Sequence, residues 1–244
     1  MQSLAPRTAQ RLLRSYLDDV AQIEVPKLQG EERRDTRLVR RTLSSLARNV
    51  ATEATLVAIA TDVGGAEGPL RSETISEYLS LLERIFLIEP QPAWNPHLRS
   101  KDSVRKRPKV HFVDPALAVA GLGTSPRGLL QDLNTLGLLF ESLVVRDLRV
   151  YAQQSDGLVS HYRDSSNLEV DAIVEAREGS WLAVEVKLGA SQVDASASSL
   201  VRFKGKIDER KTGEPAELIV VTIGNYSYRR ADGVLVVPVS MLGP

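Results

Sequence analysis

Apolar residues recur at helical spacing through the first third of the chain. Residues 7–25 carry leucine, tyrosine and valine side chains every three to four positions with charges between them, which predicts an amphipathic helix. The same spacing predicts helices near residues 38–50, 53–63 and 72–84, with Ser72 as the N-cap of the last. Four helices are therefore expected before the first segment with a strand pattern.

Two short β-like segments, residues 85–88 and 109–114, come next and flank a polar loop. Three helices followed by a β-hairpin is the layout of a winged helix, in which residues 72–84 would be the recognition helix. Within this loop, residues 95–108 contain one acid, Asp102, and five cations, which are Arg99, Lys101, Arg105, Lys106 and Arg107. This charge suits the phosphate backbone of a nucleic acid, and a solvated surface loop is the alternative interpretation.

A second domain is expected after a short helix at residues 115–123 and a linker at residues 124–128. Periodicity predicts a long helix at residues 133–153, strands near 159–163, 169–175 and 181–188, a helix around Leu200, Phe203 and Ile207, and strands near 218–223 and 234–239. This order is typical of an α/β sandwich with a mostly buried sheet. The predicted organisation is a connecting helix at 1–29, a winged-helix-like domain at 30–123 and an α/β domain at 124–244.

Composition limits the chemistry that the chain can perform. The 31 Lys and Arg residues balance 31 Asp and Glu residues, so recognition by charge must be local. Because there is no cysteine, disulfides, thiol catalysis and Cys-ligated metals are excluded. The opening residues lack the apolar core of a signal peptide, and no apolar run reaches the roughly 18 residues of a membrane span. We therefore expect a cytoplasmic protein with no membrane association.

Charged residues interrupt two of the predicted strands at particular positions. Alternation along residues 181–188 puts the leucines and valines on one face and Glu185 with Lys187 on the other. Such a pair usually marks a solvated strand face. Here the preceding strand brings a further carboxylate, Asp171, on the opposite phase from its apolar neighbours. If the two strands are neighbours, Asp171 and Glu185 approach one another and repel unless a cation lies between them.

Glu141 adds an independent indication from the long predicted helix. It lies three or four residues from Leu138, Val144 and Val145, inside the apolar stripe that should face the sheet. Burying its carboxylate is costly unless a charge compensates it. A salt bridge with Lys187 and a shared Mg²⁺ or Mn²⁺ are the two interpretations, and oxygen ligands suit these hard cations better than zinc.

The arrangement of Asp171, Glu185-Val186-Lys187 and Glu141 resembles the PD-(D/E)xK nuclease superfamily. Five blocks in order, SEYLSLLERIFLIEPQPAWN, RPKVHFVDPALAVAGLG, GLLFESLVVRDL, HYRDSSNLEVDAIVE and LAVEVKLG, are similar to the C-terminal region, including the DUF4143 domain, of a family of AAA-type ATPases. The resemblance implies a restriction-endonuclease-like α/β fold with Asp171, Glu185, Lys187 and Glu141 as catalytic residues. Glu141, Asp171 and Glu185 would bind Mg²⁺ or Mn²⁺, and the reaction would be phosphodiester hydrolysis.

The resemblance also implies an ATPase domain, either elsewhere in a longer protein or lost. The chain contains no GxxxxGK[ST], so we expect no ATP binding by these residues. The expected partners are a nucleic acid, DNA in the first place, and an ATPase domain or other protein. Two alternatives use no catalysis: a module that binds DNA or protein and keeps the four residues as an ionic cluster, and a structural regulator of an ATPase.

Overall fold

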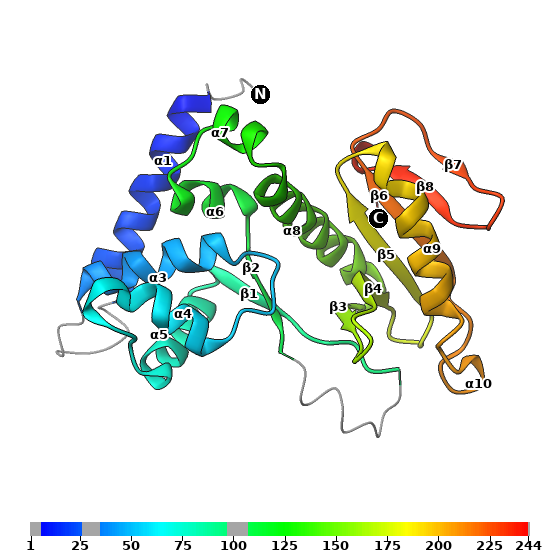
Figure 1. Ribbon diagram of the computed structural model, residues 1–244, viewed down its shortest axis with the longest axis horizontal. Helices are drawn as coiled ribbons and strands as arrows, with labels where there is room; N and C mark the ends of the chain where they lie inside the picture. The colour runs from blue at the N-terminus through cyan, green and yellow to red at the C-terminus, as the bar shows by residue number, and fades with distance from the viewer. Residues whose placement is uncertain (1–5, 26–34, 97–106, 244) are drawn as a thin grey trace. The chain divides into compact units, whose positions relative to one another are not determined.

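A computed structural model describes residues 6–25, 35–96 and 107–243 of the chain (Figure 1). It divides into two compact units. The first comprises Met1–Pro90 with Val110–Leu139, and the second comprises Gln91–Lys109 with Phe140–Pro244. The second unit therefore takes in residues 91–109, which the sequence assigns to the winged-helix-like domain. Each unit is described by itself.

Helices make up most of the first unit. Their bounds are Pro6–Asp19 (α1, continued by a π-helical turn at Val20–Glu24), Thr36–Arg48 (α3), Leu56–Gly64 (α4), Ser72–Arg84 (α5), Pro115–Leu122 (α6) and Pro126–Gln131 (α7). The expected helices are present, but two boundary predictions are wrong. Ser72 is the first residue of α5 and not its N-cap, which is Arg71. The segment expected as a linker forms α7, because the Ser125 hydroxyl accepts from the Gly128 N–H and Pro126 fits a first helical turn.

Two short strands, Ile88–Gln91 (β1) and Lys109–Phe112 (β2), pair to form a small sheet. The first strand starts later than the sequence predicts. Phe86 has φ of 55°, a left-handed conformation that interrupts the extended chain, so residues 85–87 form a turn. Gln91 and Lys109, at the ends of these strands, belong to the second unit.

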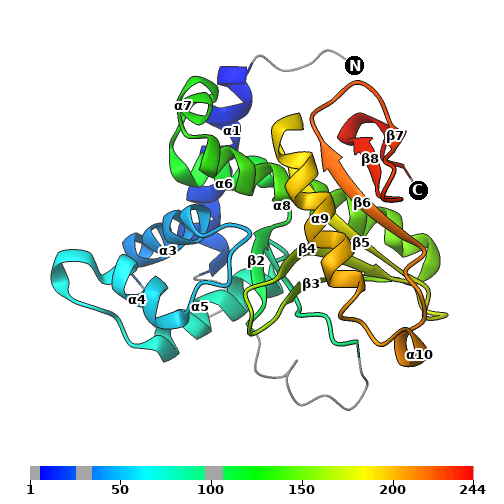
Figure 2. The same ribbon diagram turned by 45° about the vertical axis from the view of Figure 1, so that its right-hand side comes forward.

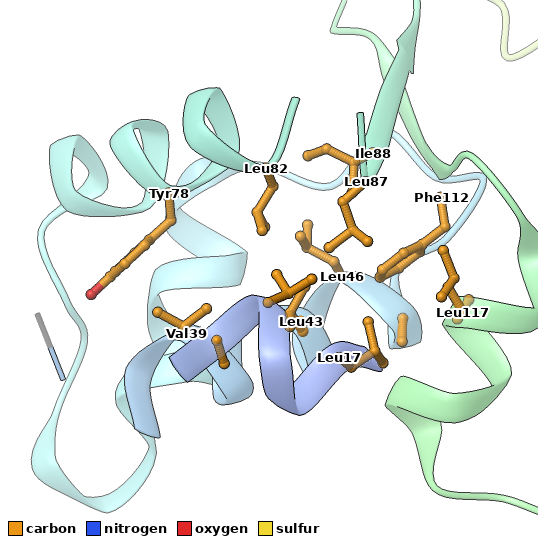
Figure 3. Packing of buried hydrophobic residues seen from close by; sticks show 14 of the residues in the cluster. Leu17, Val39, Leu43, Leu46, Tyr78, Leu82, Leu87, Ile88, Phe112 and Leu117 are labelled. Carbon is orange, nitrogen blue, oxygen red and sulfur yellow. The ribbon is translucent and has the colours of Figure 1, made fainter. Parts of the chain in front are cut away.

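The first unit has one hydrophobic core, shown in Figure 3. Leu43 and Leu46 on α3 pack with Leu82 on α5 and with Phe112 on β2, and each of these side chains is almost completely buried. Several of the residues that create helical periodicity in the sequence are therefore core residues. No helix within the described ranges combines the length and apolarity needed to cross a membrane.

A six-stranded sheet forms the centre of the second unit, with strand order β3-β4-β5-β6-β8-β7. Strands β3, β4 and β5 are antiparallel, whereas β5, β6 and β8 are parallel, and the short β7 pairs antiparallel with β8. The bounds are Leu158–Arg163 (β3), Glu169–Glu175 (β4), Trp181–Lys187 (β5), Glu217–Thr222 (β6), Tyr228–Arg229 (β7) and Leu235–Pro238 (β8). Asn167 adopts the left-handed conformation before β4 that its residue type favours, with φ of 60°.

One helix packs against each of two hydrophobic clusters of this sheet. On one side, Val144 and Val145 of α8 (Leu133–Ala152) pack with Val184 of β5. On the other side, Phe203 of α9 (Val193–Lys204) packs with Trp94 and Trp181, and Figure 2 shows α9 lying across the strands. The short helix α10 (Glu209–Thr212) follows α9. The chain is thus a mixed α and β protein, helical in its N-terminal part and with the main sheet in its C-terminal part, as the sequence predicts at this level.

Candidate functional site

Four residues predicted from the sequence lie in one group of charged side chains within the second unit. Glu141 comes from α8, Asp171 from β4, and Glu185 and Lys187 from β5. A fifth residue, Lys109 at the start of β2, completes the group through its contacts with Glu141 and Asp171. We call these five residues the ionic cluster. Its three carboxylate residues are only 8%, 5% and 5% exposed, so their charges need partners inside the unit and are largely screened from water.

Asp171 occupies the centre of the ionic cluster because of an irregularity in β4. Ser160 pairs with Ile173 and Tyr162 pairs with Val170, so β4 has one residue more than β3 between these two pairs. Such a β-bulge changes the direction of the side chains within it. The extra residue lies at Asp171 or Ala172, where strict alternation no longer holds.

Asp171 also lies where β4 and β5 cease to pair. The last pair of their ladder in this direction is Ala172 with Val184. Beyond it, the Val186 N–H donates to Asp171 Oδ2 at 2.8 Å, so a side-chain carboxylate takes the place of a strand carbonyl. The Gln91 side chain donates to the Asp171 carbonyl at 3.0 Å. These bonds fix the backbone and the carboxylate of Asp171 together.

Lys187 connects two of the carboxylates. Its Nζ lies 2.9 Å from Asp171 Oδ2 and 2.7 Å from Glu185 Oε2. The side chain of Lys187 is 27% exposed, the largest exposed fraction in the ionic cluster. Although burial acts to lower it, the pKa of Lys187 is raised above its ordinary value because both carboxylates stabilise the ammonium form. Lys187 is therefore a cation at neutral pH.

Glu141 pairs with Lys109 and not with Lys187, the partner in one of the two interpretations of the sequence. Lys109 Nζ lies 2.6 Å from Glu141 Oε1 and 3.9 Å from Asp171 Oδ1. Lys109 follows a run of arginines and lysines in the sequence, where it cannot be distinguished from a solvated charge. Its one distinguishing signal is its place at the start of a β-strand, and its partner is 32 residues away.

The ionic cluster is short of one positive charge, because three carboxylates face two ammonium groups. Burial and the neighbouring Asp171 carboxylate raise the pKa of Glu185 to about 8 and that of Glu141 to about 7. Burial acts in the same direction on Asp171, but Lys187, Lys109 and the Val186 N–H outweigh it and hold its pKa below the ordinary value. Asp171 therefore keeps its charge, and any proton that the cluster takes up resides on a glutamate.

The side chains as they stand do not form a metal site. Across the ranges that the structure describes, no group of three or more His, Asp or Glu side chains is placed so that it could hold a metal ion. In the ionic cluster, the Lys109 and Lys187 ammonium groups already bind carboxylate oxygens.

The predicted nucleic-acid contacts can be located only in part. Arg99, Lys101, Arg105 and Lys106 lie outside the described residues, and the side chain of Arg107 is exposed. The expected recognition helix α5 presents mainly acids to solvent, since Glu73, Glu77 and Glu83 are exposed beside the cation Arg84. This face would repel a phosphate backbone.

Comparison with known families assigns both halves of the chain. The model of one domain of unknown function, DUF8612, matches residues 1–128. The chain belongs to the DUF8612 family. Residues 136–242 match a second domain of unknown function, DUF4143, which confirms that part of the resemblance. No curated protein and no solved structure matches the sequence.

The two family matches divide the ionic cluster. Lys109 lies in the stretch that matches DUF8612, whereas Glu141, Asp171, Glu185 and Lys187 all lie in the stretch that matches DUF4143. The two sequence blocks at residues 76–95 and 107–123 also fall within the DUF8612 match.

The raised glutamate pKa values predict how stability depends on pH. Between pH 4.5 and about 8, folded protein retains a proton on Glu185 that unfolded protein releases, so the free energy of unfolding should fall as pH rises. The slope is at most about 1.4 kcal/mol per pH unit for each proton. Glu141 acts in the same direction up to about pH 7, whereas the lowered pKa of Asp171 removes stability only below about 3.8.

This prediction is measured by urea denaturation at several pH values in EDTA. Glu185→Gln should flatten the slope between pH 5 and 8, because the amide cannot exchange this proton. Glu214→Gln, at an exposed glutamate of the same unit, should leave the slope unchanged. Equal slopes for Glu185→Gln and the unmodified protein would contradict the assignment.

Proposed function

We propose that the second unit is a nuclease-like domain of the PD-(D/E)xK type, that it hydrolyses phosphodiesters with Mg²⁺ or Mn²⁺, and that the protein associates with DNA. One observation carries the proposal. Glu141, Asp171, Glu185 and Lys187 gather in one buried ionic cluster that holds one carboxylate more than its ammonium groups can neutralise.

The order of elements supports this proposal. Helix α8 carries Glu141, and the antiparallel strands β3, β4 and β5 follow it. Asp171 lies on β4, and Glu185 and Lys187 on the adjacent β5, and this is the distribution that the nuclease resemblance implies. Helix α9 then connects β5 to the parallel strand β6 and packs against the sheet. This connection is consistent with the mostly buried α/β sheet of a restriction-endonuclease-like fold.

The donor atoms and the charge of the ionic cluster suit a divalent cation, although its carboxylates as they stand are not arranged around one. Glu141, Asp171 and Glu185 supply hard oxygen donors, and the excess negative charge favours an added cation. A bound Mg²⁺ or Mn²⁺ would supply Lewis-acid polarisation of a phosphodiester and a more acidic bound water. Lys187, the most exposed member of the cluster, would donate hydrogen bonds to that water or to the phosphoryl oxygens on which charge develops. Asp171 would hold Lys187 in place through the 2.9 Å pair.

One observation favours a non-catalytic alternative. The ammonium of Lys109 lies 2.6 Å from Glu141 and 3.9 Å from Asp171, where it acts as a cation between two of the proposed ligands. If the Lys109 ammonium stays bound to these carboxylates, the ionic cluster is a structural element. The second unit would then be a module that binds DNA or protein and cleaves neither.

A cleavage assay decides between these two functions. We expect the protein to nick or linearise plasmid DNA in Mn²⁺ or Mg²⁺, and Asp171→Asn and Lys187→Gln to lower the rate by about 100-fold or more. Glu169→Gln, on the same strand as Asp171, and Lys206→Gln are the matched controls and should cleave at the unmodified rate. Background cleavage that is the same in all five proteins would reject the enzyme.

The first unit supports DNA association through its order of elements. Helices α3, α4 and α5 precede the two-stranded sheet of β1 and β2, as in a winged helix. Because the exposed face of α5 is acidic, the phosphate contacts are assigned to the basic segment that ends at Arg107 and not to this helix. The protein would work with an ATPase domain or partner, which the similarity to ATPase C-terminal regions suggests.

Salt dependence tests the phosphate contacts of the basic segment. In the test, the affinity for a fluorescent DNA duplex is measured at several salt concentrations. Replacing Arg105, Lys106 and Arg107 with glutamine should reduce the magnitude of the slope of log affinity against log salt concentration. The expected reduction is about 0.9 for each phosphate that the protein no longer neutralises. Replacing Arg202, Lys204 and Lys211 removes the same charge elsewhere in the second unit and should leave the slope closer to that of the unmodified protein. If both triple variants lower the slope equally, the segment has no specific role.

A further inference from the structure

Lys109 combines three properties that ordinary salt-bridge lysines lack. Its side chain is 9% exposed, its Nζ lies against two carboxylates, and those carboxylates belong to α8 and β4, two of the elements that carry the proposed metal ligands. By comparison, Lys206 pairs with Asp164 at a similar distance of 2.6 Å but is 40% exposed. Lys109 thus supplies a positive charge at a place from which solvent cations are largely excluded.

An ammonium and a divalent cation compete for the same oxygens. Both bind carboxylates, but Mg²⁺ needs oxygen ligands at about 2.0–2.1 Å, and Glu141 Oε1 is engaged by Lys109 at 2.6 Å. With all three carboxylates ionised and Lys109 in place, a divalent ion would turn the excess of one negative charge into an excess of one positive charge within a buried site. With Lys109 withdrawn, the same ion would leave the site neutral, which costs less in a low dielectric.

Lys187 cannot take this role. It bonds to both Asp171 and Glu185 and is the most exposed member of the cluster, and the proposed chemistry requires it beside the ion. Lys109 contributes nothing that the proposed chemistry uses. It also comes from the stretch that matches the DUF8612 model, whereas the four proposed catalytic residues come from the stretch that matches DUF4143.

We propose that Lys109 is a built-in competitor for the divalent cation: its ammonium neutralises Glu141 and Asp171, and the site accepts Mg²⁺ or Mn²⁺ when Lys109 leaves. This inference rests on the proposed metal site and adds its regulation. The region matching DUF8612 thereby controls the site built by the region matching DUF4143.

The test is Mn²⁺ binding to the full chain by isothermal titration calorimetry, with Mn²⁺ alone as the probe. Lys109→Gln should bind Mn²⁺ about tenfold or more tightly than the unmodified protein, because no ammonium has to be displaced. It should also unfold at lower temperature in EDTA and regain stability when Mn²⁺ is added. Lys206→Gln should leave Mn²⁺ affinity unchanged.

A double variant controls for misfolding. Lys109→Gln with Glu141→Gln removes both partners of the pair, so it should fold in EDTA as well as the unmodified protein but lose the gain in Mn²⁺ affinity. Equal Mn²⁺ affinity in the unmodified protein and Lys109→Gln would overturn the competitor role and leave the metal site standing. No Mn²⁺ binding by either folded protein would overturn both, and the ionic cluster would be structural.

Discussion

The burial of three carboxylates beside two ammonium groups is the constraint on which the second unit depends. Removing such charges from water is expensive, and their mutual attraction repays this cost only when the geometry is good. The unit meets the requirement with bonds of 2.6–2.9 Å from two lysines and with the Val186 N–H aimed at Asp171. One negative charge still remains, which is why protons or cations should bind here and why the cluster is more than an inert salt bridge.

Much of the fold could be predicted from the sequence because its pattern is strong. Strand β4 has the predicted bounds, and β5 ends one residue earlier than predicted, since alternating apolar residues identify both. Errors occur where local backbone chemistry decides the structure. The left-handed Phe86 delays β1, and a serine cap with a following proline converts an expected linker into α7.

Four of the five residues of the ionic cluster could be predicted from the sequence, but Lys109 and the pairing could not. Glu141 could be identified because it lies among apolar residues, where a buried carboxylate needs a countercharge. Glu185 and Lys187 could be identified because they share one face of a strand. The identity of the partner depends on tertiary structure, and Lys109 comes from a run of basic residues that looks solvated. The β-bulge beside Asp171 is equally invisible in the sequence, because no turn residue marks it.

We infer that the ionic cluster is a divalent-cation site and that the Lys109 ammonium competes with the cation for its carboxylates. Anomalous X-ray scattering from crystals grown with Mn²⁺ tests this inference, with the unmodified chain and Lys109→Gln compared at the same ion concentration. We expect a manganese peak at about 2.0–2.2 Å from carboxylate oxygens of Asp171 and Glu185, stronger in Lys109→Gln. A manganese-free cluster in both crystals, with Lys187 still paired to Asp171, would contradict the inference.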